Sequence, residues 1–236
     1  MKPEREWVET AKKNAALEAA KHVRDGFVIG LGSGSTAAYA IEEIGRKIKK
    51  EKLRVLGVPT SYQAFQLAVE NDIPLTTLEE HPELDLAIDG ADQIDEKLNL
   101  IKGIGGALAR EKIVASASKC FIIVADEKKK VKTLGENSQP LPIEILPFAK
   151  TLVEKRIEKI GGKPCLRTGT GKVGPVITDN GNIILDVDFG LIQDPVKLEV
   201  DVKSITGVVE TGLFVRMADI IYLGKPSGVA RLPTAK

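Results

Sequence analysis

Aromatic residues are scarce in this 236-residue sequence, in which six Phe, three Tyr and one Trp make up 4% of the chain. A core of ordinary size must therefore be built from Ile, Val, Leu and Ala, which suits parallel strands buried on both faces. An excess of charge of one sign is also missing, because 34 Lys and Arg stand against 33 Asp and Glu. This balance gives no electrostatic case for nucleic acid or an anionic membrane as partner, so we expect a small-molecule ligand.

Cysteine and histidine are equally sparse, and no apolar run is long enough to cross a bilayer or to act as a signal segment. Cys120 and Cys165 lie far apart, as expected of a reduced, cytoplasmic protein. Neither His22 nor His81 belongs to an HxH or HExxH pattern. We therefore expect no membrane partner and no catalytic metal.

The stretch from Leu84 to Ala115 concentrates carboxylates, a lysine and glycines more densely than any other segment. Its first residues, LDLAI, predict a short buried strand, and Asp89 and Asp92 follow at the carboxyl end of that strand. Open α/β sheets place their ligands at this end of the strands, so both carboxylates should face a crevice.

Lys102 leads into a turn with glycines at 103, 105 and 106, where the backbone can adopt positive φ and aim its amides inward. Amides so placed can stabilise an oxyanion. The next segment has helical composition, and Glu111 lies about one turn into it, where its carboxylate can reach back over the glycines. Each feature alone is also typical of an ordinary turn or a solvated helix, but together they predict a proton-transfer site.

A second glycine-rich loop, GLGSGSTA, joins the apolar run FVIGLG to a helix that should begin near Thr36. The hydroxyls of Ser33, Ser35 and Thr36 and the amides at a helix amino end form a ready anion site. The spacing matches neither GxxxxGK[ST] nor GxGxxG, so we expect neither a nucleoside triphosphate nor a dinucleotide. A sugar phosphate fits better, and a plain strand-to-helix turn is the alternative.

Strand-like and helical segments alternate through the first 126 residues. The predicted strands are FVIGLG, LRVLGVP, Ile73 to Leu78, LDLAID and CFIIVAD. This alternation predicts the α/β fold class, with a doubly wound, mostly parallel sheet.

The pattern changes after Asp126, and the order strand, helix, strand, strand, helix predicts a smaller α+β domain over residues 131–206. This order is typical of the split β-α-β, ferredoxin-like arrangement. The strands from Gly207 onward should rejoin the first sheet, so the main catalytic domain is predicted to comprise residues 1–130 and 207–236. The lysines of KKKVK at 128–132 follow the carboxyl end of a strand, and we expect at least one of them to face the crevice.

These motifs together resemble the ribose-5-phosphate isomerases of type A over essentially the whole chain. GLGSGSTA, IDGADQID, KGIGGALAREKIVAS, ADEKKKV, TDNGNIILDV and GVVETGLF stand in the order of that family and at about its spacing. The resemblance implies a two-domain isomerase of the pentose phosphate pathway that interconverts ribose 5-phosphate and ribulose 5-phosphate. It also implies that the enzyme uses neither a metal nor an organic cofactor and assembles as a homodimer or homotetramer.

The resemblance implies site residues as well. The general base of the family matches Glu111, and Asp89, Asp92 and Lys102 complete the catalytic set. Lys129 matches a substrate-binding lysine, with Lys128 and Lys130 as alternatives. The implied substrate-binding residues are Ser33, Gly34, Ser35, Thr36, Asp89, Gly90, Ala91, Asp92, Lys102, Gly103, Ile104, Gly105 and Lys129. Ile104 stands where the family more often has a third glycine.

The chemistry of an aldose-ketose conversion agrees with these residues. One carboxylate can move a proton between C2 and C1 through an enediolate, and Glu111 suits that task. Lys102 and the amides of residues 103–106 can stabilise the developing oxyanion. Asp89 is the candidate for ring opening, and Asp92 would orient either sugar hydroxyls or Lys102.

Two other classes of function share this kind of fold. A sugar-phosphate-sensing module of a transcription regulator would need a DNA-binding segment, but no helix-turn-helix precedes residue 26. An acyl or CoA transferase-like enzyme could use a glutamate nucleophile. It would need room for a large thioester carrier, whereas the motifs here describe one compact site.

Overall fold

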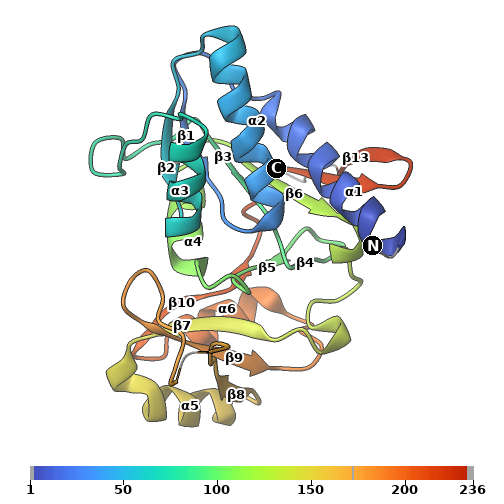
Figure 1. Ribbon diagram of the computed structural model, residues 1–236. Helices are drawn as coiled ribbons and strands as arrows, with labels where there is room; N and C mark the ends of the chain where they lie inside the picture. Colours follow the sequence, from blue (N-terminus) through green and yellow to red (C-terminus); the bar gives the residue numbers. More distant parts are fainter. Residues whose placement is uncertain (1–2, 172, 233–236) are drawn as a thin grey trace. The chain divides into compact units, whose positions relative to one another are not determined.

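The computed structural model describes residues 3–171 and 173–232, which divide into two compact units (Figure 1). Unit 1 comprises residues up to 91, 110–129 and from 217 onward, and unit 2 comprises 92–109 and 130–216. The predicted domains placed residues 92–109 and 207–216 in the main domain. The two compact units instead place both segments in unit 2. The domain boundaries given in the sequence analysis stay a prediction.

Unit 1 is built on a six-stranded sheet in the order β13-β12-β6-β3-β1-β2. All neighbouring strands are parallel except β12 and β13, which form an antiparallel pair at one edge. The predicted doubly wound, mostly parallel sheet is therefore confirmed. Its strands are β1 (Val28–Leu31), β2 (Leu56–Pro59), β3 (Leu86–Asp89), β6 (Phe121–Asp126), β12 (Ile220–Lys225) and β13 (Gly228–Leu232).

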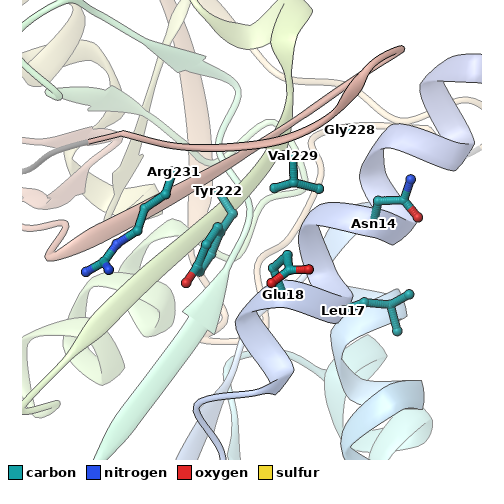
Figure 2. A pocket seen from close by; sticks show the side chains of 7 residues that line it. All are labelled: Asn14, Leu17, Glu18, Tyr222, Gly228, Val229 and Arg231. Atoms are coloured by element: carbon teal, nitrogen blue, oxygen red, sulfur yellow. The ribbon is translucent and has the colours of Figure 1, made fainter.

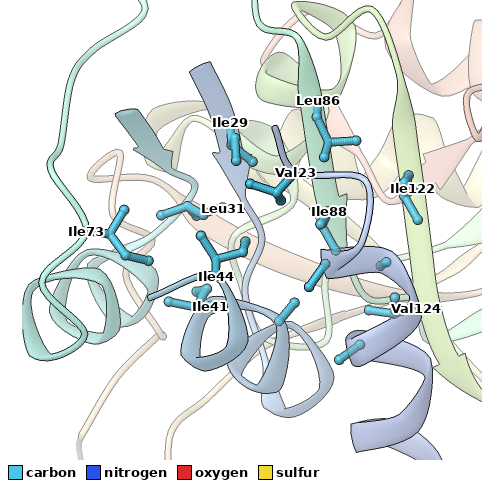
Figure 3. Packing of buried hydrophobic residues seen from close by; sticks show 14 of the residues in the cluster. Val23, Ile29, Leu31, Ile41, Ile44, Ile73, Leu86, Ile88, Ile122 and Val124 are labelled. Carbon is cyan, nitrogen blue, oxygen red and sulfur yellow. The ribbon is translucent and has the colours of Figure 1, made fainter. Parts of the chain in front are cut away.

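The main core of unit 1 is aliphatic, as the shortage of aromatic residues requires (Figure 3). Alternate residues of a strand point to opposite faces, and Ile29 and Leu31 of β1 enter this core together with side chains of the first helices. Gly30 points to the other face, where an added Cβ would lie 2.3 Å from Val114. The helices of unit 1 are α1 (Pro3–Ala20), α2 (Ser35–Glu51), α3 (Tyr62–Glu70) and most of α4 (Leu108–Ser116).

Unit 2 contains a four-stranded antiparallel sheet in the order β10-β7-β9-β8. Along the chain its elements read strand, helix, strand, strand, helix, which is the predicted order, followed by one more strand that was not predicted to belong here. Ile143 and Ile145 of β7 pack with Val153 and Ile157 of the first helix. The elements are β7 (Leu141–Ile145), α5 (Lys150–Lys159), β8 (Lys163–Leu166), β9 (Ile183–Asp188), α6 (Pro195–Lys203) and β10 (Val208–Thr211).

Three details of the predicted topology were wrong. Ile73 to Leu78 forms no strand and contributes a single bridge, between Leu75 and Gly57. Val208–Thr211 does not rejoin the first sheet. It forms β10, which pairs with β7 because that edge of the sheet in unit 2 is open to a further strand. A three-stranded sheet of β11 (Leu213–Phe214), β5 (Leu100–Ile101) and β4 (Gln93–Ile94) was also not predicted, since strands of two residues leave no periodic signal.

Among the described residues, the remaining elements are three short 3₁₀ helices, at Glu127–Lys129, Glu136–Ser138 and Pro147–Ala149. The helices in the described part of the chain include none that is long and apolar enough to cross a membrane.

Candidate active site

The loop that follows β1 lies against the carboxyl end of β3 in unit 1. The backbone N–H of Ser33 donates to Oδ1 of Asp89 at 3.1 Å, and the N–H of Gly90 donates to the same oxygen at 2.7 Å. The chain runs from β1 outward to β2 and then returns to the other side of β1 with β3. Doubly wound sheets bind ligands at such a reversal of strand order, so Ser33 and Asp89 occupy the expected edge.

Gly32 makes the close approach of this loop to Asp89 possible. A Cβ at position 32 would lie 2.3 Å from Oδ1 and 2.6 Å from Cα of Asp89. Real Cβ atoms do not come so near to other heavy atoms, so a side chain here would push the loop away from the carboxylate. Asp89 itself is 2% exposed, and the loop amides supply hydrogen bonds that a buried carboxylate needs.

The hydroxyl and amide groups of the loop have partners on the segment that enters α3. Ser33 Oγ lies 2.7 Å from Thr60 Oγ1 and donates to Ser61 Oγ at 2.6 Å. The N–H of Gly34 donates to Oε1 of Gln63 at 2.8 Å. Gly34 has a φ of 95° and immediately precedes α2, so the loop turns sharply into that helix. Ser35 and Thr36 then form its first turn, where helix amides favour an anion.

Lys12 is a residue that the sequence analysis missed. Its ammonium group donates to Ser35 Oγ at 3.3 Å and pairs with Glu9 at 2.8 Å. Hydrogen bonds from Lys12 and Tyr39 lower the pKa of the Glu9 carboxyl, so Glu9 stays charged and holds the lysine. A cation thus lies beside the amino end of α2. The sequence offered only a lysine in a charged helix 23 residues earlier, which no local pattern distinguishes from a solvated one.

Glu111 lies in the first turn of α4 and is 4% exposed. The alternative interpretation of Glu111 as solvated helix surface is therefore wrong. Glu111 and Val114 share a face of the helix because they are three residues apart, and Val114 packs at Gly30. The opposite end of α4 lies at the amino end of β3, where Leu84 N–H donates to the carbonyl of Ala117. Glu111 is consequently directed toward the carboxyl end of the sheet.

The three lysines after β6 differ in their surroundings. Lys128 is exposed and its ammonium lies 5.2 Å from the ring centre of Trp7. Lys130 is also exposed, whereas Lys129 is partly buried within the short 3₁₀ helix. Lys129 is thus the least exposed of the three, and the choice among them stays a prediction.

The remaining predicted residues belong to unit 2. Lys102 is 3% exposed, and its ammonium lies 5.4 Å from the ring centre of Phe214, a favourable cation–π distance. Asp92 accepts a hydrogen bond from the backbone N–H of Ile104 at 3.0 Å. Gly103 and Gly106 have φ angles of 101° and 81°, and the N–H of Gly106 closes the turn on the carbonyl of Gly103. The predicted glycine turn with positive φ is therefore present.

A cavity of about 540 Å³ lies elsewhere in unit 1, between α1 and the β12–β13 hairpin (Figure 2). Its lining includes Glu18, Tyr222 and Arg231 but none of the predicted site residues. Within residues 3–171 and 173–232, no cluster of three or more His, Cys, Asp or Glu side chains is placed to hold a metal ion.

Known proteins share both the sequence motifs and this architecture. Residues 56–228 match the family model described as ribose 5-phosphate isomerase A (phosphoriboisomerase A). The chain belongs to the ribose-5-phosphate isomerase A family. Ribose-5-phosphate isomerase A of Methanosarcina acetivorans is 52% identical to it over 94% of both chains. The predicted resemblance is thereby confirmed.

Solved structures of ribose-5-phosphate isomerases agree with this membership. The enzyme from Methanocaldococcus jannaschii is 46% identical and has a TM-score of 0.92, with 96% of this chain and 99% of that chain covered. A D-ribose-5-phosphate isomerase in complex with phospho-erythronic acid is also 46% identical, has a TM-score of 0.93, and covers the same shares of the two chains.

The structure explains the glycine at position 212, which belongs to the family-like motif GVVETGLF. A Cβ at Gly212 would lie 2.3 Å from the carbonyl oxygen of Lys102 and 3.0 Å from that of Pro142. Glycine at 212 lets three backbone segments meet, and its own carbonyl accepts the N–H of Lys102 at 2.9 Å. The motif therefore fixes the backbone that carries the lysine.

Proposed function

We propose that the chain catalyses the interconversion of D-ribose 5-phosphate and D-ribulose 5-phosphate. Membership of the ribose-5-phosphate isomerase A family supports this reaction. The relative in complex with phospho-erythronic acid supports it further, because the planar carboxylate of that acid resembles an enediolate. The observation that carries the proposal is the buried carboxylate of Glu111 in the first turn of α4.

In the proposed mechanism Glu111 is the general base. Its carboxylate removes the proton from C2 of the open-chain aldose, and the electrons of that C–H bond form the C1–C2 double bond of an enediolate. The carbonyl oxygen on C1 takes up the negative charge. Glu111 then returns its proton to C1, and the proton of the C2 hydroxyl passes to the charged oxygen on C1, so that C2 becomes the ketone and C1 carries a hydroxyl. One side chain thus serves both transfers.

Lys102 and the glycine turn are proposed to stabilise the charge of the enediolate. A buried ammonium group and backbone amides act strongly on an oxyanion because little water screens them. Asp92, which accepts the N–H of Ile104, is proposed to hold the turn and to orient sugar hydroxyls. Gly103, Ile104 and Gly105 would thus contribute through their backbone, which explains why Ile can replace Gly at position 104.

Asp89 is proposed to open the furanose ring of ribose 5-phosphate by moving a proton between O1 and the ring oxygen. The amides of Ser33 and Gly90 both donate to its Oδ1, so one edge of the carboxylate is fixed by the protein. Gly90 and Ala91 continue the turn after β3 and would contribute backbone contacts to the sugar.

The phosphate and neighbouring hydroxyls are proposed to bind at the amino end of α2. Ser33, Gly34, Ser35 and Thr36 supply amides and hydroxyls there, and the ammonium of Lys12 lies beside Ser35. Lys129 would supply a further positive charge. These groups bind the part of the substrate that does not react.

Thr36→Ala tests that division of roles. Removing a hydroxyl that binds a charged phosphate should raise KM for ribose 5-phosphate about 10- to 100-fold, since a hydrogen bond to a charged group contributes about 1.5–3 kcal/mol. It should leave kcat within about twofold. Steady-state kinetics measure both constants. Thr10→Ala is the matched control, because the Thr10 hydroxyl bonds only to the Glu6 carbonyl of its own helix and is exposed. A large fall in kcat at unchanged KM would assign the loop to catalysis.

Direct assay tests the function itself. The purified chain, after exhaustive treatment with EDTA, should convert ribose 5-phosphate to ribulose 5-phosphate, detected as ketose. No turnover with either sugar phosphate would refute the proposed function. Activity that returned only with an added divalent ion would refute the metal-free mechanism.

Neither rival function receives support from the relatives described above. The matched family, the curated relative and the two solved structures described above are named as isomerases, not as transcription regulators or acyl transferases. The proposed cytoplasmic location rests on the sequence argument alone, in which Cys120 and Cys165 lie far apart along the chain.

We also propose that the chain forms a homodimer or homotetramer. Phe148 is fully exposed in unit 2, with Leu146 and Leu152 half-exposed nearby in sequence. An exposed apolar segment such as residues 146–152 is a candidate for coverage in an assembly. Light scattering at micromolar concentration should therefore give a mass of at least twice 25.4 kDa, and Phe148→Asp should lower it. A wild-type mass of about 25 kDa would contradict the proposal.

A further inference from the structure

The carbonyl groups of the glycine turn in unit 2 are held by one side chain from a distant part of the sequence. Arg167 Nη1 donates to the carbonyl oxygen of Gly103 at 3.0 Å and to that of Ile104 at 2.8 Å. The two carbonyls belong to consecutive peptide groups. A single guanidinium nitrogen therefore fixes the orientation of both peptide planes.

Because peptide groups are planar, the direction of these two carbonyls also sets the direction of the following amides. In a trans peptide the C=O and the following N–H point in opposite directions. Because the carbonyls of residues 103 and 104 face Arg167, the N–H groups of Ile104 and Gly105 must face away from it. The N–H of Ile104 does so, and donates to Asp92. In the described part of the chain the N–H of Gly105 donates to no protein acceptor, so it is free to serve a ligand.

Arg167 is itself held in place by Asp186. The guanidinium donates through Nε to Oδ2 at 2.8 Å and through Nη2 to Oδ1, which is the two-point geometry that only arginine offers to a carboxylate. Both side chains are mostly buried, and Asp186 lies on β9 directly opposite Cys165 of β8. The strand pairing of unit 2 thus positions the guanidinium before any substrate binds.

We propose that Arg167 is a positioning residue for the isomerase reaction, which aims the amide of Gly105 at the developing enediolate. Arg167 does not touch the reacting atoms and acts through the turn. The inference rests on the proposed function, and it adds to it the residue that keeps the oxyanion donors oriented. Preorganised donors matter because an oxyanion is stabilised only by groups already aimed at the position where the charge develops.

Arg167→Lys is the decisive variant. An ammonium group cannot bond the two carbonyls and both carboxylate oxygens at once, so the turn should lose its fixed orientation. We expect kcat to fall about 10²-fold, with KM changed less than threefold, because loss of one oxyanion donor typically costs that much or more. The kcat of Arg167→Ala should recover at least tenfold when guanidinium chloride is added at non-denaturing concentration, and equal sodium chloride should have no such effect.

Arg54→Lys is the matched control. Arg54 makes the same two-point bond, to Asp25, but both partners are well exposed and neither side chain bonds to the turn at residues 103–106. This variant should keep wild-type kcat and KM. Thermal unfolding of all variants, with activity measured well below each midpoint, separates lost catalysis from lost folding.

Hydrogen–deuterium exchange tests the orientation of the turn without relying on enzyme activity. Hydrogen–deuterium exchange of the peptide that contains residues 103–106 should be at least tenfold faster in Arg167→Lys than in wild type or Arg54→Lys, because the Ile104 amide loses its fixed bond to Asp92. Unchanged exchange, a kcat within twofold of wild type, or a loss confined to KM would each overturn the proposal. Absence of turnover in the wild type would instead refute the proposed function, and the exchange result would still decide the role of Arg167.

Discussion

Glu111→Gln should lower kcat for ribose 5-phosphate by about 10²–10⁴-fold, the range expected for a positioned general base. Glutamine keeps the size and shape of the side chain but takes no proton from C2. The substrate should still bind, because the proposed phosphate contacts lie at the amino end of α2, so KM should change little. Steady-state kinetics in both directions measure the effect.

Proton exchange gives a second measure of the same substitution. In heavy water the wild type should introduce deuterium at C1 of ribulose 5-phosphate, since the base exchanges its proton with solvent between the two transfers. The Gln variant should not. Glu70→Gln is the matched control: Glu70 ends α3 on an exposed helix surface, the environment that the rival interpretation assigned to Glu111. Near-normal turnover and exchange in Glu111→Gln would show that another group, with Asp89 as the next candidate, is the base.

Asp89→Asn should lower turnover of ribose 5-phosphate but, unlike Glu111→Gln, should largely spare proton exchange on the ketose. Turnover of ribose 5-phosphate should fall by about 10²-fold, because an amide cannot move the proton that opens the furanose ring. Ribulose 5-phosphate needs no ring opening, since its only hydroxyl that could close a five-membered ring on C2 carries the phosphate. The variant should therefore still exchange deuterium into C1 of the ketose at a rate within about tenfold of wild type.

Asp89→Asn should leave the loop after β1 in place, so changes in turnover can be attributed to the lost carboxylate. Asn retains an Oδ1 that can accept the N–H groups of Ser33 and Gly90. Circular dichroism and thermal unfolding check that the fold survives. If exchange into the ketose disappeared together with turnover, Asp89 would belong to the proton shuttle at C1 and C2, and the proposed division between Asp89 and Glu111 would be wrong.

Much of the architecture could be predicted from the sequence because it is encoded locally. Apolar runs such as LDLAID and CFIIVAD predict strands buried on both faces, and they form β3 and β6 of the parallel sheet. Asp89 follows from the same argument, since a polar residue at the carboxyl end of such a strand lies at the ligand edge. Glu111 follows from a helix that begins after a glycine turn. These features depend on residues within a few positions of one another.

In unit 2, local sequence patterns predicted the elements but not all of the strand pairing. The helix and strand order after Asp126 indicated a ferredoxin-like unit, but Val208–Thr211 was assigned to the wrong sheet. A strand pattern says which face is buried and not which neighbour it pairs with. That choice depends on which sheet edge is open once the rest of the chain has folded, and the edge of β7 is open in unit 2.

By itself, the sequence determined the aliphatic α/β architecture, the glycine turns and the positions of the candidate catalytic carboxylates along the chain. Only the tertiary structure decided which residues support them. Lys12 reaches Ser35 across 23 residues, and Arg167 reaches the carbonyls of Gly103 and Ile104 across more than 60. The physical reason is that periodicity records burial and backbone geometry, which are local. A hydrogen bond between distant segments exists only after strand pairing and packing have brought its two ends together.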